Sequence, residues 1–211
     1  SRLRMLRVPY VISGSGKTVP EDTGTYPKSA LVTTDTEIES QSMVDYLCSC
    51  GHKRVAFITS GDEGLGRCHL NGYKRALEKN GLEYDEKLIV RLKPGNRIYT
   101  IENGYNSTCE LLESGVDFSC IYAISDTLAV GACKAIIDSG KRVPEDYCVA
   151  GADGQDIAEY YHPSITTLEY PRVETAQQSI RTLFDMIDRK KVVKRQMLAG
   201  RLIERESTRK L

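Results

Sequence analysis

The feature that most constrains the fold is an alternation of short apolar runs with longer stretches of helical periodicity. The apolar runs lie at residues 8–12, 30–33, 55–58, 88–92, 118–124, 148–150, 166–170 and 196–206. The helical patterns lie at residues 37–49, 67–80, 99–114, 127–139, 155–161 and 172–190. Gly51, Gly81 and Gly140 follow three of these patterns, where a glycine commonly ends a helix. Strands that alternate with helices build βαβ units, so the sequence predicts a mostly parallel sheet with helices on both faces.

Composition and charge limit the class of protein. The chain has 211 residues, of which 40% are hydrophobic and 27% charged, as is typical of a globular domain. Lys plus Arg and Asp plus Glu both number 29, so the formal net charge is zero. A protein that binds nucleic acid by itself usually carries a basic face, so we do not expect this chain to contact DNA. With no long apolar run and no signal-peptide core at the N-terminus, we expect no membrane partner.

The cysteines indicate a reducing compartment. They lie at positions 48, 50, 68, 109, 120, 133 and 148. Their number is odd and most fall within apolar or helical patterns, which favours reduced thiols that pack as small hydrophobic side chains in a cytosolic protein. Cys48 and Cys50 form a close pair near His52, but a zinc site would need a second pair of ligands. We therefore expect no metal and no cofactor.

Two aspartates directly follow apolar runs. Asp126 comes after a run that ends at Ile124, and Asp153 comes after the run that begins at Cys148. In an open α/β sheet the ends of the parallel strands meet at a crevice where ligands bind. Carboxylates there are predicted to accept hydrogen bonds from hydroxyls or amines of a ligand. Each aspartate could instead cap the helix that follows it, and the sequence leaves both roles open.

Eight short motifs occur in an order and at a spacing that match one family. They are Asp35, Gly51-His-Lys-Arg-Val-Ala-Phe-Ile58, Arg67 with Gly72-Tyr73, Ser125-Asp-Thr-Leu-Ala-Val-Gly131, Val143-Pro-Glu-Asp146, Gly151-Ala-Asp153, Pro163-Ser-Ile-Thr-Thr167 and Leu202-Ile-Glu-Arg-Glu-Ser-Thr208. Any one of them is a weak signal, but together they are specific. Over residues 1–208 the chain resembles the effector-binding domain of LacI/GalR-type bacterial transcription regulators.

The resemblance implies an α/β fold of the periplasmic-binding-protein-like type I. In it, two Rossmann-like lobes with parallel sheets hold a ligand in the cleft between them. The N-terminal lobe is expected at residues 1–49 plus 170–191, and the C-terminal lobe at residues 50–169 plus 192–211. The helix-turn-helix head of the family and the first strands and helices of the N-terminal lobe have no counterpart in this sequence. We therefore expect an N-terminally truncated domain with an incomplete N-terminal lobe.

The resemblance also suggests ligand-binding residues beyond the two aspartates. Arg67 matches the arginine that clamps the effector, although it could also be a solvated arginine at a helix start. Tyr99 falls where the family often places an aromatic ring against the effector, Tyr170 lies on a segment that crosses between the lobes, and Asp35 ends a strand of the N-terminal lobe. Ser125 replaces an asparagine that often contacts the effector, and it offers one hydroxyl in place of an amide.

The function implied by the resemblance is that of an effector sensor. A sugar, sugar derivative or nucleobase would bind between the lobes, shift their orientation and change operator affinity. The protein would act as a cytoplasmic homodimer and reach DNA only through an N-terminal head outside this chain. A periplasmic-type sugar-binding protein of the same fold is the alternative, but it would need an export signal and would usually avoid seven thiols. No nucleophile–base pair or metal set accompanies the carboxylates, so we expect no catalytic residues and no enzyme.

Overall fold

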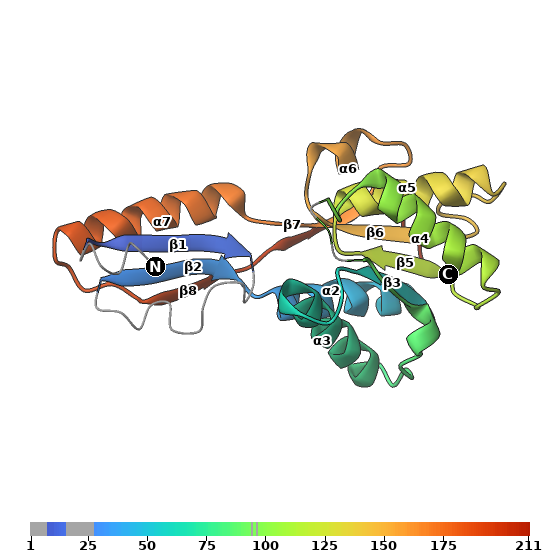
Figure 1. The fold of residues 1–211 in the computed structure, drawn as a ribbon, viewed down its shortest axis with the longest axis horizontal. Coiled ribbons are helices and arrows are strands. Elements are labelled where there is room, and N and C mark those ends of the chain that lie inside the picture. The colour runs from blue at the N-terminus through green and yellow to red at the C-terminus, as the bar shows by residue number, and fades with distance from the viewer. Residues whose placement is uncertain (1–7, 16–27, 94, 96) are drawn as a thin grey trace. The chain divides into compact units, whose positions relative to one another are not determined.

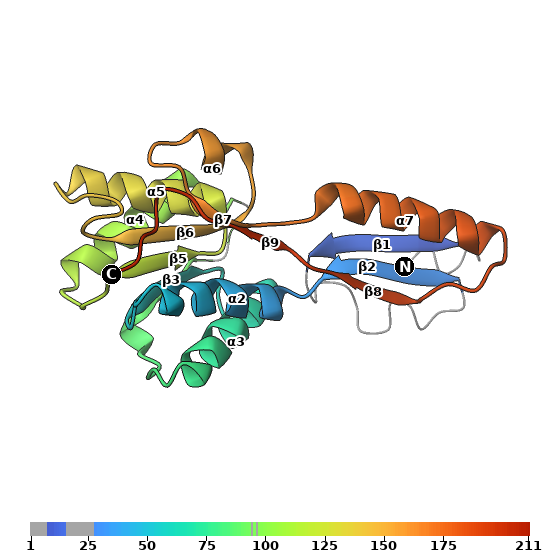
Figure 2. The same ribbon diagram turned by 180° about the vertical axis from the view of Figure 1, so that it is seen from behind.

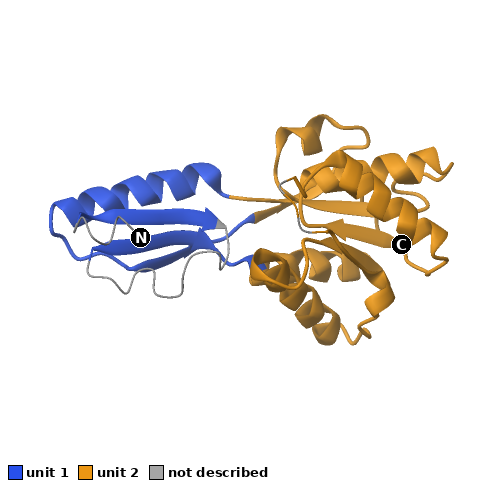
Figure 3. Cartoon of the chain, viewed as in Figure 1, with its two compact units in different colours: residues 1–36, 171–200 blue, residues 37–170, 201–211 orange. Residues whose placement is uncertain are grey.

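The chain folds into two compact units. The computed structural model describes residues 8–15, 28–93, 95 and 97–211. Unit 1 comprises residues 1–36 and 171–200, and unit 2 comprises residues 37–170 and 201–211 (Figure 3). The chain therefore passes from one unit to the other after Thr36, Tyr170 and Gly200. None of the helices in the described residues has the length and apolar character needed to cross a bilayer.

Unit 1 is built on a small parallel sheet. Its strands are β1 (Tyr10–Ser15), β2 (Ser29–Thr34) and β8 (Arg195–Leu198), and β2 lies in the middle. All three strands run parallel, and every residue of β2 is buried. Helix α7 (Arg172–Ile187) lies along one face of this sheet (Figures 1 and 2). Residues 16–27, which connect β1 to β2, lie outside the described residues.

Unit 2 contains a six-stranded sheet in the order β4-β3-β5-β6-β7-β9. Its strands are β3 (Val55–Thr59), β4 (Ile89–Arg91), β5 (Cys120–Ala123), β6 (Cys148–Asp153), β7 (Thr166–Glu169) and β9 (Arg201–Ile203). The first five strands in this order are parallel, and β9 pairs with β7 in the antiparallel direction. The predicted parallel-dominated α/β fold is therefore confirmed.

Helices cover both faces of the unit 2 sheet. They are α2 (Thr36–Ser49), α3 (Gly64–Lys79), α4 (Ile101–Glu113), α5 (Asp126–Asp138) and α6 (Asp156–Tyr160), and a short 3-10 turn, η2 (Glu86–Leu88), precedes β4. Figures 1 and 2 show α2 and α3 on one face and α4, α5 and α6 on the other. Parallel crossovers are right-handed, so the step from β3 out to β4 uses one face, and the steps back across the sheet use the opposite face.

The large apolar core lies in unit 2. It contains the inward residues of the sheet and of α2 to α5, and three aromatic rings stack at its centre. The ring of Phe57 lies 4.9 Å from that of Tyr73 and 5.2 Å from that of Tyr122. The hydroxyl of Tyr73 donates to the carbonyl of Val55 at 2.8 Å, so its buried polar atom is satisfied.

Two glycines let α4 and α5 pack unusually closely. A Cβ at Gly104 would collide with the carbonyl of Leu128, and a Cβ at Gly131 would collide with the carbonyl of Ile101. Each helix thus presents a glycine to the backbone of the other. This close crossing brings the first turns of α4 and α5 together on one side of the sheet.

The unit boundaries differ from the predicted ones at two places. Helix α2 was expected in the N-terminal lobe, but Met43, Val44 and Leu47 belong to the core of unit 2, and the hydroxyl of Ser40 donates to the carbonyl of His69 at 2.8 Å. The predicted strand at residues 196–206 is two strands. Its first part, β8, pairs with β2 in unit 1, and its second part, β9, pairs with β7 in unit 2.

Candidate functional site

The candidate site lies along one edge of the unit 2 sheet. Because β4, β3, β5, β6 and β7 are parallel and adjacent, their carboxyl ends form a single edge. Six of the seven predicted residues follow those ends. Tyr99 precedes α4 after β4, Arg67 is in the first turn of α3 after β3, Ser125 and Asp126 follow β5, Asp153 ends β6 and Tyr170 follows β7. Asp35 follows β2 and therefore belongs to unit 1.

Asp126 is fully buried and holds the edge together. Its Oδ2 accepts a hydrogen bond from the backbone N–H of Gln155 at 2.6 Å, and its Oδ1 accepts one from the hydroxyl of Thr167 at 2.6 Å. Burial raises the pKa of Asp126 to about 6, although these two bonds act in the opposite direction. The carboxylate thereby ties α5 to the β6–α6 connection and to β7. Asp126 therefore stabilises the carboxyl edge of the sheet from inside the protein, and its side chain is not exposed to solvent.

Ser125 caps helix α5. Its hydroxyl accepts a hydrogen bond from the backbone N–H of Leu128 at 3.3 Å, and the residue is buried. The sequence left open whether Asp126 caps this helix or binds a ligand. In the structure Ser125 is the capping residue, and Asp126 is the first residue inside the helix. Whether the Ser125 hydroxyl also touches a ligand stays a prediction.

Asp153 is partly exposed and has a strained backbone. Its φ angle is 101°, in a region that residues with a Cβ rarely adopt. Its Oδ2 accepts a hydrogen bond from the side chain of Gln155 at 3.1 Å, and its carbonyl accepts one from the backbone N–H of Tyr170 at 3.3 Å. Gln155 therefore connects Asp153 to Asp126. Gln155 was not among the predicted residues, because no motif or periodicity in the sequence marks it.

Arg67 lies at the other end of the edge, beside a second arginine. The Nε of exposed Arg67 donates to the carbonyl of Asp62 at 2.9 Å, which uses one of its five N–H donors. The carboxylate of the same Asp62 pairs with Arg91 at 2.8 Å, and Arg91 also pairs with Glu86 at 2.5 Å. The hydrogen bonds that Arg91 donates to the carboxylates of Asp62 and Glu86 raise the pKa of its guanidinium above the ordinary value, so the group stays charged. Sequence reasoning missed Arg91, although it stands at the end of a predicted strand.

The three remaining candidates are each partly accessible to solvent. Tyr99 precedes α4 and is 43% exposed, so its ring faces solvent in part. Tyr170 is half-buried at the last position of unit 2 before the chain enters unit 1. Asp35 is also half-buried. Contact of these three residues with a ligand stays a prediction.

The edge as a whole offers hydrogen-bond donors at one end and an acceptor at the other. Arg67 can donate to hydroxyl or anionic oxygens, and Asp153 can accept from hydroxyls or amines. Within the described residues there is no grouping of three or more His, Cys, Asp or Glu side chains suited to a metal ion. The chemistry of the edge fits reversible binding of a polar organic molecule.

Sequence comparison relates the chain to a domain family and to transcription regulators that match it. Residues 44–208 match the family described as periplasmic binding protein-like domain. The HTH-type transcriptional regulator MalR of Clostridium butyricum is 38% identical over 146 residues, which are 69% of this chain and 42% of that protein. The HTH-type transcriptional regulator CelR of Thermobifida fusca is 33% identical over 85% of this chain and 50% of its own length. The chain thus spans about half the length of the curated relatives it matches.

Solved structures show the same fold. A sugar-binding regulator of the LacI family from Escherichia coli, complexed with phosphate, superposes with a TM-score of 0.81 at 31% identity over 93% of this chain and 68% of its own. The complex of the regulator CelR with cellobiose gives 0.80 at 31% identity, over 95% of this chain and 59% of its own. A LacI-family regulator from Enterococcus faecium with bound ribose gives 0.79 at 28% identity, over 96% and 72%.

Proposed function

The chain belongs to the periplasmic binding protein-like family, as an effector-binding domain of the LacI/GalR type, and from this premise we propose that it senses a small polar molecule for a transcription regulator. The effector binds at the carboxyl edge of the unit 2 sheet. Arg67 and Asp153 make the principal polar contacts there. Asp126 and Gln155 hold Asp153 in place from the protein side.

The observation that carries this proposal is the backbone of Asp153. A residue with a Cβ at φ of 101° costs conformational energy, and such strain gathers where a side chain must be aimed at a ligand. The next residue, Gly154, has a φ of 64° and would bring a Cβ against Glu169. The chain therefore turns sharply at the end of β6, and Gln155 closes the turn by binding both Asp126 and Asp153.

The chemical class of the effector follows from the groups at the edge. A guanidinium that donates and a carboxylate that accepts suit a molecule with several hydroxyls, and an exposed ring at Tyr99 suits the flat face of a sugar or nucleobase. Two structures similar to this chain hold cellobiose and ribose. We therefore place sugars and sugar derivatives first and nucleobases second.

Regulation would follow from a difference in effector affinity between two arrangements of the units. Three chain crossings connect the units, so a ligand that binds one arrangement better shifts the population toward it. In a complete regulator, acting as a homodimer in the cytoplasm, that shift would alter operator binding by DNA-binding segments outside this chain. Such coupling is typically worth about 1–3 kcal/mol, and it acts equally on effector and DNA. The relatives are regulators, which favours this function over periplasmic-type sugar transport.

The test is a thermal-shift screen with cellobiose, ribose, other sugars and nucleosides, followed by titration calorimetry of any compound that stabilises the chain. A specific ligand at 100 times its Kd should add about 2.7 kcal/mol of stability. Arg67→Ala and Asp153→Ala should each weaken binding at least about tenfold, because each removes a charge-assisted hydrogen bond. The matched control is Lys74→Gln, which changes an exposed cation on the same helix as Arg67.

Two results would overturn the site. One is an effector whose affinity is unchanged in both the Arg67 and the Asp153 variants. The other is equal weakening in Lys74→Gln, which would show that overall charge governs binding.

A further inference from the structure

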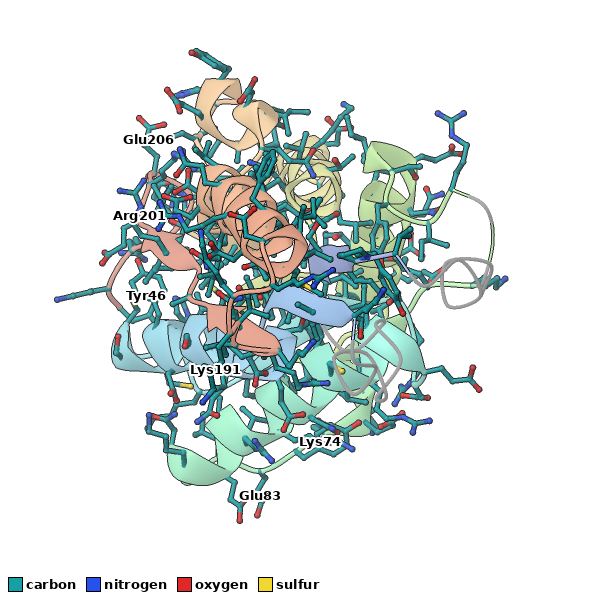
Figure 4. All side chains as sticks on the ribbon, turned by 90° about the vertical axis from the view of Figure 1, so that its left-hand side faces the viewer. Tyr46, Lys74, Glu83, Lys191, Arg201 and Glu206 are labelled. Atoms are coloured by element: carbon teal, nitrogen blue, oxygen red, sulfur yellow. The ribbon has the colours of Figure 1, made fainter. Side chains whose placement is uncertain are left out.

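A basic cavity lies within unit 1, apart from the residues of the proposed effector site. Its volume is about 550 Å³, within the range of small-molecule pockets. It sits where α7 ends and where the strands of the unit 1 sheet begin. Figure 4, in which Lys191 is labelled, looks toward this end of unit 1.

Five of the nine residues that line the cavity are cationic. They are Lys28, Arg189, Lys190, Lys191 and Lys194. The apolar part of the lining is Pro9, Met186, Ile187 and Val192. The chain as a whole is electrically neutral, so this concentration of positive charge is local: four of the cations lie on the α7–β8 connection, and Lys28 directly precedes β2.

Among the described residues, two carboxylates pair with one of these cations. Asp185 and Asp188 both pair with the ammonium of Lys190, each at 3.1 Å. Lys194 is anchored differently, because its ammonium donates to the carbonyl of Ser29 at 3.0 Å. A helix C-terminus attracts cations, but its partial charge is equivalent to only about half an elementary charge. The helix end alone does not account for five cations.

The conformation of Arg189 gives an independent indication. Its φ is 60°, so it occupies the left-handed region directly after the C-cap residue of α7. This position favours glycine or asparagine, because a Cβ is crowded there. An arginine at this place is disfavoured by local geometry, and a role for its guanidinium in the cavity would explain its presence.

We propose that this cavity binds a small organic polyphosphate, with its phosphoryl oxygens among the five cations and its carbon part on the apolar lining. Guanidinium and ammonium groups are the usual protein partners of phosphoryl oxygens. The site is separate in the sequence from the effector-binding residues and does not depend on them.

The test uses inorganic tripolyphosphate as the probe, titrated by calorimetry into the whole chain at about 50 mM and about 300 mM salt. We expect saturable one-to-one binding that weakens at the higher salt concentration. The double variant Arg189→Gly with Lys191→Gln should bind at least about tenfold more weakly. It should keep or exceed the melting temperature of the unmodified chain, because glycine suits the left-handed position.

The matched control removes two exposed lysines from unit 2, by Lys53→Gln with Lys141→Gln. The proposal is upheld if the Arg189/Lys191 variant loses at least about tenfold in affinity while this control binds tripolyphosphate within about twofold of the unmodified chain. It is overturned if both double variants weaken binding equally, or if neither does. Binding of duplex DNA but not of tripolyphosphate, lost in the Arg189/Lys191 variant, would also overturn it, because the phosphates recognised would then belong to a nucleic acid backbone.

Discussion

The core of unit 2 buries large apolar side chains, whereas α7 of unit 1 exposes several. In unit 2, the centre of the sheet carries Phe57 and Tyr122, which are both almost completely inaccessible to solvent. In unit 1, Ile180 and Phe184 on α7 are 57% and 61% exposed. The side of α7 turned inward carries Thr175 and Thr182 as its buried residues. The outer side of α7 therefore differs from the core of unit 2, although β2 in the same unit as α7 is buried throughout.

The inward side of α7 is held by polar contacts. The side chain of Gln178 donates to that of Gln196 on β8 at 2.6 Å, and Gln196 donates to the hydroxyl of Thr182 at 2.9 Å. A net hydrogen bond contributes about 1 kcal/mol, whereas a fully buried large apolar side chain contributes about 1.5–3 kcal/mol. We therefore expect unit 2 to supply most of the stability of the chain.

The largest expected effect comes from the centre of the unit 2 core. Phe57→Ala removes a ring that stacks on both Tyr73 and Tyr122, so it should lower the free energy of unfolding by about 3–5 kcal/mol. The chain has no tryptophan, so urea unfolding is best followed by far-UV circular dichroism. A loss below about 1 kcal/mol would mean that this core does not govern the transition.

Asp126 should make unit 2 sensitive to pH. Its pKa in the fold is about 6, above the ordinary value of 3.8, because burial disfavours the charged carboxylate. Between these values the folded chain keeps a proton that the unfolded chain has released. Stability should therefore fall as pH rises from about 4 to about 6, by at most about 3 kcal/mol, and this contribution should then level off.

The check is urea unfolding at several pH values. Asp126→Asn should remove the fall, because an amide can accept from Gln155 and donate to the hydroxyl of Thr167 without becoming charged. The control is Asp138→Asn, an exposed carboxylate paired with Lys134, which should keep the fall. An Asp126→Asn variant with the same pH slope as the unmodified chain would refute the assignment.

The layered fold was predictable because it depends on local patterns. Apolar runs and helical spacing located nearly every element, and Gly51 and Gly140 mark helix ends with φ of 100° and 80°. The positions of Arg67 and Asp153 at one sheet edge follow from the same alternation once the strands are parallel. Local signals of this kind need no knowledge of distant contacts.

The features that could not be predicted all depend on long-range contacts. Spacing predicted a helix at residues 172–190, but it could not show that Ile180 and Phe184 would lie on its exposed side. Asp126 looked like a capping or ligand-binding residue, and its burial depends on Thr167, far along the chain. The strand predicted at residues 196–206 was divided between two sheets, because each half finds a different partner strand.

Glycine-to-alanine substitutions should also affect the stability of the two units differently, although the loss is smaller than for Phe57→Ala. Gly131→Ala should destabilise unit 2 by about 2 kcal/mol, because the added Cβ meets the backbone of Ile101 and Tyr105, which cannot move independently. This cost exceeds the gain of about 1 kcal/mol in helix propensity. The matched control is Gly14→Ala in β1 of unit 1, where, among the described residues other than its two chain neighbours, no atom lies within 4 Å of the added Cβ. Equal losses in both variants, measured by urea unfolding, would contradict the close α4–α5 crossing.

The smallest expected effect concerns the exposed stripe of α7. Phe184→Gln should change the free energy of unfolding by no more than about 0.5 kcal/mol, because the ring is largely exposed and glutamine favours a helix more than phenylalanine does. The same change should reduce self-association, measured by light scattering at increasing concentration, because it removes the largest apolar side chain from the stripe. A loss above about 1 kcal/mol at low protein concentration would show that Phe184 is packed within the folded chain. It would then contradict the contrast between the exposed apolar side chains of α7 and the buried ones of the unit 2 core.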